Sequence, residues 1–274
     1  MTGAEPTLAE TDGRDSARHC ALASGSPLVL SLFPGIGLLD HAFELEGFTV
    51  VRGPDLLWGG DVRRFHALPG RFDGVIGGPP CQKFSTASKH AGTQAVDLIP
   101  EFLRVVREAQ PKFVVMENVR QAVGHPDIPR DWSHAVLRDC DCGGHTLRTR
   151  AFWTWPMMVW EPGGKADGEY EHSVMATSWK RGSSDSQYVK DKGFLPGDLP
   201  VMEYARLQGA EVIGERLQEY KAGKPFAVHV LGNGVPVAMG RYVARAVRDA
   251  LANNKVRDAR AESGASPSVE ASPE

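Results

Sequence analysis

The sequence GVIGGPPCQKFS at residues 74–85 places a cysteine directly after two prolines, at the end of an apolar run. Proline lacks the amide donor that a strand needs, so Pro79 and Pro80 end the strand and stiffen the turn that follows. A thiol presented there, Cys81, is suited to nucleophilic chemistry when it is deprotonated. The residues alone leave three interpretations open: a nucleophile, a metal ligand, or a loop residue without a role.

Glycines and acids follow two other apolar runs. Gly35 and Gly37 come after the run at 27–33, where glycine lets the backbone turn tightly and approach a ligand. Asp55 lies about 20 residues past these glycines, at the distance expected of a ribose-binding acid, and Asp61 offers a second acceptor. Taken singly, each has a structural alternative: a tight turn without a ligand, or an aspartate that caps its own loop.

A carboxylate and two guanidinium groups occur further along the chain. Glu117 lies near the end of the apolar run 112–119, and Arg148 and Arg150 alternate in the sequence RTR. A carboxyl group beside apolar neighbours has a raised pKa, which suits proton donation at neutral pH. The alternatives are a helix cap for Glu117 and a solvated strand face for the two arginines.

These residues need elements that bring them together. Between residues 27 and 252, short apolar runs typical of buried strands alternate with segments of helical periodicity. This order predicts an α/β fold with a doubly wound, mostly parallel sheet, in which ligands bind at the carboxyl ends of the strands. The predicted strands lie at 27–33, 48–51, 72–78 and 112–119, and the predicted helices include 96–109, 200–213 and 236–251.

Composition limits the cell compartment and the partners that can be expected of this protein. Residues 1–26 and 253–274 are rich in Ala, Ser, Gly, Pro and Glu, are predicted to be disordered tails, and together hold the whole net charge of −3. Four cysteines are too few for a disulfide framework, and neither a secretory signal nor a membrane span is recognisable. We therefore expect a cytoplasmic, reduced protein that contacts no membrane.

Several motifs occur in one order: SLFPGIG, GGPPCQKFS, ENV, RTR, RLQG and GNGVPVAMGRYVARAV. Together they resemble the cytosine-5 DNA methyltransferase family, from about residue 28 to about residue 250. The resemblance implies the Rossmann-like fold of S-adenosylmethionine-dependent methyltransferases, with a catalytic domain at 27–153 that is completed by 200–252. It implies a short target-recognition segment at 154–199, a small irregular insertion.

The resemblance also implies S-adenosylmethionine as the cofactor. Asp55 is expected to hold the ribose hydroxyls, and Asp61 with Val62 is expected to meet the adenine. The full set of expected cofactor-binding residues is Phe33, Gly35, Gly37, Asp55, Asp61, Val62, Pro80 and Asn233.

The implied reaction takes place on a cytosine that has been flipped out of the duplex. The Cys81 thiolate attacks C6, which makes C5 nucleophilic towards the methyl group. Glu117 hydrogen-bonds or protonates N3, and Arg150 contacts O2 and steadies the anion, with Arg148 as a second candidate.

Double-stranded DNA is the implied partner. The polar segment 84–94 resembles the family's mobile catalytic loop, and 154–199 interleaves aromatic and cationic residues that suit phosphate and base contacts. An equally favoured alternative makes 154–199 a loosely packed surface insertion. The expected DNA contacts are Gln82, Ser85, Ser88, Lys89, Lys180 and Arg181.

Three positions depart from the family pattern. The first motif usually begins with an acid and here has Ser31, its third glycine is Leu38, and the glutamine before the arginines is Thr146. Two other functions stay open: an RNA (tRNA) cytosine-5 methyltransferase, and a non-catalytic nucleic-acid-binding accessory subunit. We expect a monomer, with a cognate restriction endonuclease as a possible partner in the same system.

The segment DWSHAVLRDCDCGGH at 131–145 invites a zinc interpretation. Structural zinc sites usually space paired cysteines by two to four residues, whereas Cys140 and Cys142 are separated by one. We therefore expect no metal site there and interpret the segment, which ends at His145, as a polar loop.

Overall fold

A computed structural model describes residues 25–80, 96–156, 158, 160–161, 170–178, 180, 186–194 and 198–262, with backbone alone at 186–187 and 254–262. Several residues singled out in the sequence lie outside these ranges: Cys81, Gln82, Ser85, Ser88, Lys89 and Arg181. No helix in the described part of the chain is long and apolar enough to cross a membrane.

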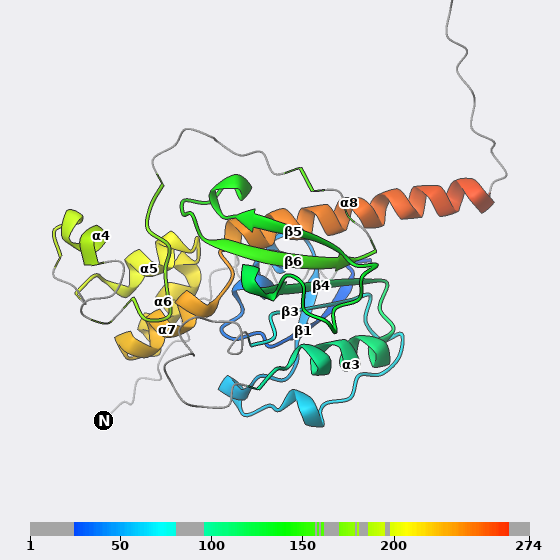
Figure 1. The fold of residues 1–274 in the computed structure, drawn as a ribbon, viewed down its shortest axis with the longest axis horizontal. Helices are drawn as coiled ribbons and strands as arrows, with labels where there is room; N and C mark the ends of the chain where they lie inside the picture. Colours follow the sequence, from blue (N-terminus) through cyan, green and yellow to red (C-terminus); the bar gives the residue numbers. More distant parts are fainter. Residues whose placement is uncertain are drawn as a thin grey trace, which may run out of the picture.

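A mixed six-stranded sheet forms the centre of the fold, in the order β2-β1-β3-β4-β6-β5 (Figure 1). The first four strands along the chain run parallel, while β6 pairs antiparallel with β4 and with the edge strand β5. The prediction of a mostly parallel α/β sheet is thereby confirmed. The strands are β1 (Leu28–Leu32), β2 (Thr49–Arg52), β3 (Gly74–Gly77), β4 (Phe113–Asn118), β5 (Ser133–Arg138) and β6 (Thr149–Trp155).

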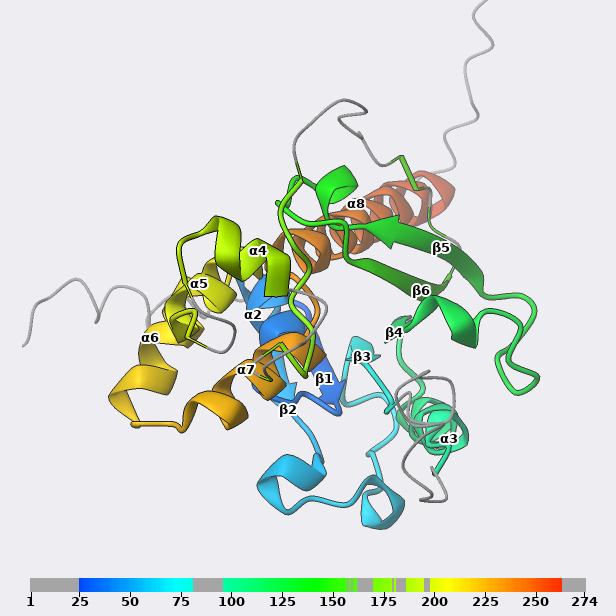
Figure 2. The same ribbon diagram turned by 60° about the vertical axis from the view of Figure 1, so that its left-hand side comes forward.

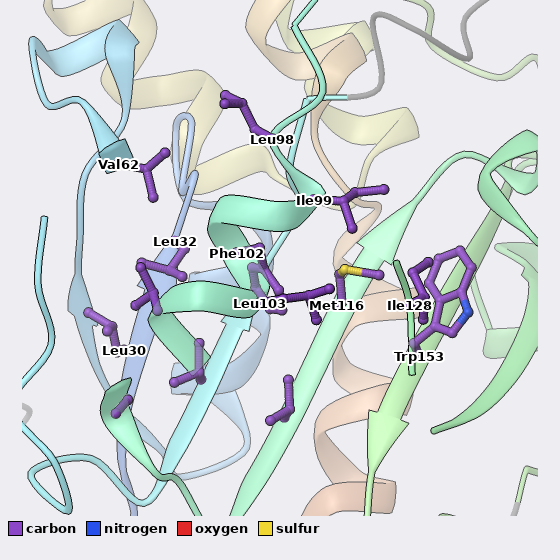
Figure 3. Packing of buried hydrophobic residues seen from close by; sticks show 14 of the residues in the cluster. Leu30, Leu32, Val62, Leu98, Ile99, Phe102, Leu103, Met116, Ile128 and Trp153 are labelled. Atoms are coloured by element: carbon purple, nitrogen blue, oxygen red, sulfur yellow. The ribbon is translucent and has the colours of Figure 1, made fainter. Parts of the chain in front are cut away.

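Helices cover both faces of the sheet because the inner strands are apolar on both faces. On one face, α3 (Ile99–Ala109) packs Phe102 against Leu32 and Met116 from the strands (Figure 3). On the other face lie α2 (Leu38–Leu45) and α8 (Val237–Glu262), which run side by side. Short 3-10 helices connect the larger elements: η1 (Leu56–Trp58), η2 (Val62–Arg64), η4 (Arg120–Ala122) and η5 (Cys140–Cys142).

Four helices form a separate group beside the sheet (Figure 2). They are α4 (Ser186–Asp191), α5 (Val201–Leu207), α6 (Glu211–Glu219) and α7 (Lys224–Asn233). Val174, Val189 and Leu199 are buried in one apolar cluster with residues of α5 and α7. These three residues of 154–199 therefore share one apolar cluster with the helices that follow.

The prediction of a polar loop at 131–145 is wrong. Residues 133–138 form β5, in which Leu137 is buried while His134, Val136 and Arg138 are exposed. This alternation is the pattern of an edge strand with one covered face, and it was present in the sequence. Cys140 and Cys142 follow in η5 as buried free thiols, so they belong to the packing beneath this edge.

The helices after residue 200 also differ from expectation. The predicted helix 200–213 is divided into α5 and α6, because Gly209 takes a left-handed backbone at φ 63°. Asn233 was expected in a loop but is the last residue of α7. The final helix runs to Glu262, so the first residues of the expected tail 253–274 are helical, as suits their Ala, Arg and Lys content.

Candidate active site

A cavity of about 580 Å³ opens where β1, β3 and β4 end. The turn after β1 forms one wall, the Gly78–Pro80 turn after β3 a second, and the last residues of α7 close the opposite side. A smaller cavity of about 110 Å³ adjoins it and shares Phe33, Asp55, Leu56 and Pro80 with it. This is the crevice that the sheet topology predicts.

Most of the described candidate residues meet in these two cavities. The larger one is lined by Phe33, Gly35, Asp55, Pro80, Glu117, Arg150 and Asn233. Asp61 and Val62 line the smaller one. Gly37, Arg148 and Lys180 line neither, and Lys180 lies exposed in the segment that follows Ser178.

Left-handed backbone shapes the turn after β1. Phe33 and Gly35 both have φ 56°, and Gly37 has φ 83°, a region that favours glycine. A Cβ on Gly37 would stand 2.6 Å from Arg52 Nη2, so this glycine makes room for a side chain of β2. Gly37 therefore allows Arg52 to pack behind the cavity wall. Its position does not support the expected direct contact with a cofactor.

Asp55 connects two segments of the cavity wall, the turn after β1 and the start of η1. Its Oδ2 accepts a hydrogen bond from the Gly35 amide at 2.8 Å, and its Oδ1 accepts one from the Leu57 amide at 2.7 Å. Each carboxylate oxygen has a second lone pair, so these contacts leave acceptor capacity on the cavity side. Loop capping and ligand binding, which the sequence presented as alternatives, are compatible in this geometry.

Asp61 is paired with a neighbour at the mouth of the smaller cavity. Its two oxygens accept hydrogen bonds from the Arg63 guanidinium at 2.7–3.1 Å and from the Arg63 amide at 3.0 Å. These hydrogen bonds lower the pKa of Asp61 to about 2, so the carboxylate is ionised at neutral pH. A ligand amine at this position would meet a fixed acceptor.

Glu117 and Arg150 form an ion pair at the wall of the larger cavity. Arg150 Nε lies 2.8 Å from Glu117 Oε1, and both side chains are largely buried. Glu117 faces Phe152 across the β4–β6 pair, so Arg150, two residues before Phe152, is its diagonal neighbour on one face of the sheet. Burial raises the pKa of Glu117, and the positive charges of Arg150 and Arg148 oppose that rise.

Gly78 leaves room for the carboxylate of Glu117. A Cβ on Gly78 would stand 2.7 Å from Glu117 Oε2, closer than atoms approach without rearrangement.

We expect Gly78→Ala to lower the free energy of unfolding by about 1–3 kcal/mol, because Glu117 must leave its position or the turn must shift. Urea titration monitored by fluorescence measures the change. Gly223→Ala is the matched control, because nothing lies within 4 Å of its added Cβ. Equal effects of the two substitutions would contradict the packing argument.

Arg148, the second candidate for the contact with O2, makes structural hydrogen bonds. Its guanidinium is buried and donates hydrogen bonds to the carbonyl oxygens of Val174, Gly232 and Gly234 at 2.5–3.1 Å. These contacts join the start of β6 to the segment 170–178 and to the turn between α7 and α8. Its influence on the site is indirect, through its charge near Glu117 and through the position of that turn.

Two site residues were not singled out in the sequence. His229 lines the cavity from α7, with Nε2 3.0 Å from Asn233 Nδ2. Asp40 lies at the cavity floor on α2. The spacing of four residues between His229 and Asn233 indicates one helix face, but the helix itself had not been predicted.

Solved structures share this fold. The chain matches a prophage-encoded candidate DNA modification methyltransferase of E. coli, with a TM-score of 0.58, 18% identity and coverage of 82% of this chain and 99% of that chain. It matches the S. pombe Dnmt2 methyltransferase with a TM-score of 0.56, 12% identity and coverage of 82% and 99%. At these identities the likeness establishes the α/β fold alone.

Sequence comparison then identifies the family. The chain is 38% identical over 263 residues to the type II methyltransferase M.AquIA of Picosynechococcus sp., covering 82% of this chain and 98% of that protein. It is 33% identical over 111 residues to M.NgoPII of Neisseria gonorrhoeae, a match that spans 33% of each. The profile of the C-5 cytosine-specific DNA methylases matches residues 59–138. The chain belongs to this family of DNA cytosine-5 methyltransferases, which confirms the resemblance seen in the motifs.

Proposed function

We propose that this protein transfers a methyl group from S-adenosylmethionine to C5 of a flipped-out cytosine in DNA, through a covalent bond between Cys81 and C6. The observation that carries the proposal is the buried Glu117–Arg150 pair, which lines the cavity beside the Gly78–Pro80 turn that leads directly into Cys81. Family membership supports DNA as the substrate and a type II restriction–modification context.

The cavity fits the cofactor in size and in its acceptors. Ligand sites for small molecules have volumes of about 300–1,000 Å³, which includes the larger cavity here. Asp55 can accept hydrogen bonds from ribose hydroxyls, and the adjoining small cavity, with Val62 and Leu98 as apolar walls and Asp61 as acceptor, suits a purine. S-adenosylmethionine would supply an electrophilic methyl group.

The side chains would divide the remaining chemistry between them. The Cys81 thiolate forms a bond to C6, and the displaced electron pair passes to N3, where Glu117 delivers its proton. Arg150 would donate hydrogen bonds to O2 as negative charge develops there. After C5 has accepted the methyl group, loss of the C5 proton to a base, elimination of Cys81 as thiolate and return of the N3 proton to Glu117 restore the ring.

DNA contacts are proposed for the segment after Cys81 and for Lys180 and Arg181. The loop after Cys81 supplies Gln82, Ser85, Ser88 and Lys89, which lie outside the described residues together with Arg181. Lys180 is exposed next to the packed segment 170–178, where a cation can contact a phosphate.

The test is radiolabelled methyl transfer to duplex DNA and to tRNA by the full chain. Transfer to DNA, followed by recovery of 5-methylcytosine, is the expected result. Transfer confined to tRNA would overturn the DNA assignment, and no transfer to either would favour the accessory-subunit alternative.

Asp55→Ala is expected to weaken cofactor binding by about 1–3 kcal/mol, because it removes the proposed ribose acceptor and the anchor of the Gly35 turn. Isothermal calorimetry with S-adenosylmethionine measures the loss. Asp73→Ala, at the opposite end of β3, is the control for general loss of stability. An unchanged affinity in Asp55→Ala would place the ribose contact elsewhere.

A further inference from the structure

The floor of the larger cavity holds a fully buried carboxylate that the reaction does not use. Asp40 belongs to α2 and is 0% exposed, yet it lines the cavity together with Ser31. Ser31 is near the end of β1 and shares a strand face with Val29, which is the face that α2 covers. The two side chains therefore meet between the sheet and the helix, directly below the cavity.

Asp40 contacts one neighbour with each of its two carboxylate oxygens. Ser31 Oγ lies 2.5 Å from Asp40 Oδ1, and Arg52 Nε lies 3.0 Å from Asp40 Oδ2. An ionised carboxylate only accepts hydrogen bonds, so the Ser31 proton lies between the two side chains. The oxygen of Ser31 keeps its lone pairs, and donation to a carboxylate makes it a stronger acceptor.

Arg52 compensates the buried charge from the opposite side. Its side chain is 49% exposed, and its guanidinium lies over Gly37, where any Cβ would collide with it. Burial raises the pKa of Asp40, and the hydrogen bond from Ser31 and the positive charge of Arg52 oppose that rise. The ion pair thus connects solvent-exposed Arg52 to the cavity floor through Asp40 and Ser31.

We propose that Asp40, acting through Ser31, holds the α-amino group of the cofactor. The inference rests on the proposed function, because it takes S-adenosylmethionine as the occupant of the cavity. The first motif here has Ser31 where the family pattern has an acid, and the structure places the missing carboxylate nine residues later, on α2. Ser31 makes the contact with the ammonium group, and Asp40 is the positioning residue that supplies the negative charge.

The test compares two ligands that differ only in this amino group. They are S-adenosylhomocysteine and its analogue that lacks the α-amino group, and dissociation constants are measured by calorimetry. The full chain should bind the amino-bearing ligand about tenfold or more tightly, as a charge-assisted hydrogen bond requires. In Ser31→Ala and in Asp40→Asn this preference should fall to about twofold or less, while binding of the deaminated analogue changes little.

Three variants separate positioning from folding. Ser133→Ala removes another hydrogen-bonded strand serine, on β5, and should leave both constants unchanged. Asp55→Asn should weaken both ligands by the same factor. The double variant Ser31→Asp with Asp40→Asn moves the acid to β1. It should restore the preference for the amino-bearing ligand, and it keeps the test valid if Asp40→Asn alone folds poorly.

The outcomes are distinguishable. A preference that persists in both Ser31→Ala and Asp40→Asn would show that the amino group is held elsewhere and overturn this inference, while the proposed function stands. If Asp40→Asn loses the preference and the double variant fails to restore it, Asp40 would only connect α2 to β1, without a role in ligand binding. If the unaltered chain binds neither ligand, the proposed cofactor is wrong and the inference fails with it.

Discussion

Replacing Glu117 with Gln should lower the rate of methyl transfer by about 10²–10⁴-fold, the range that general acid catalysis supplies. The amide keeps the shape of the side chain and can still donate a hydrogen bond to N3, but it has no proton to transfer. Single-turnover transfer of labelled methyl groups to DNA measures the loss. Binding of the cofactor should change little, because Glu117 faces the proposed base end of the cavity.

The pH profile separates a proton donor from a merely structural acid. The raised pKa of Glu117 keeps its proton to higher pH than an ordinary glutamate, and the rate should fall as pH rises through that pKa. The Cys81 thiolate is favoured in the opposite direction, so the profile should be bell-shaped. Glu117→Gln should lose the alkaline decline attributable to this acid. A variant that is slower but keeps that decline would reject Glu117 as the donor.

Cys81→Ala should abolish methyl transfer altogether, since no other group is proposed to attack C6. The affinity for S-adenosylmethionine should be retained, because the thiol attacks the base and does not hold the cofactor. Radiolabel transfer and calorimetry measure the two quantities on the same preparation.

Trapping provides a second readout for Cys81. DNA with 5-fluorocytosine at target positions should form a stable covalent adduct with the unaltered protein, because fluorine cannot leave C5 as a proton does. Denaturing electrophoresis shows the adduct as a retarded band. Residual turnover in Cys81→Ala would remove this residue from the mechanism.

The central sheet and the acids at its edge were predictable from the sequence. Buried parallel strands appear as continuous apolar runs, and ligand-binding residues follow directly at their carboxyl ends, which located Asp55 and Glu117. The edge strand β5 was missed, because its single covered face replaces the apolar run with an alternation that resembles a polar loop.

The roles of neighbouring residues could not be separated by sequence alone. Arg148 and Arg150 have the same type and lie two positions apart, yet Arg150 meets Glu117 while Arg148 meets carbonyl groups more than 80 residues away. Asp40 appears in the sequence as an ordinary polar position of an amphipathic helix. Its burial follows from how α2 is seated against β1, a tertiary contact that periodicity does not encode.

The hydrogen bonds of Arg148 define where a foreign segment could replace part of 154–199, the proposed target-recognition segment. They are made to main-chain oxygens. The guanidinium therefore depends on the path of the backbone at position 174, and it makes no hydrogen bond to the side chain there. Gly232 adds a steric condition, because a Cβ there would overlap the backbone of Met175 and Ala176. A transplant that keeps the backbone through 174–176 would keep these hydrogen bonds. It would also need apolar side chains at positions 189 and 199, because both are buried among the helices that follow.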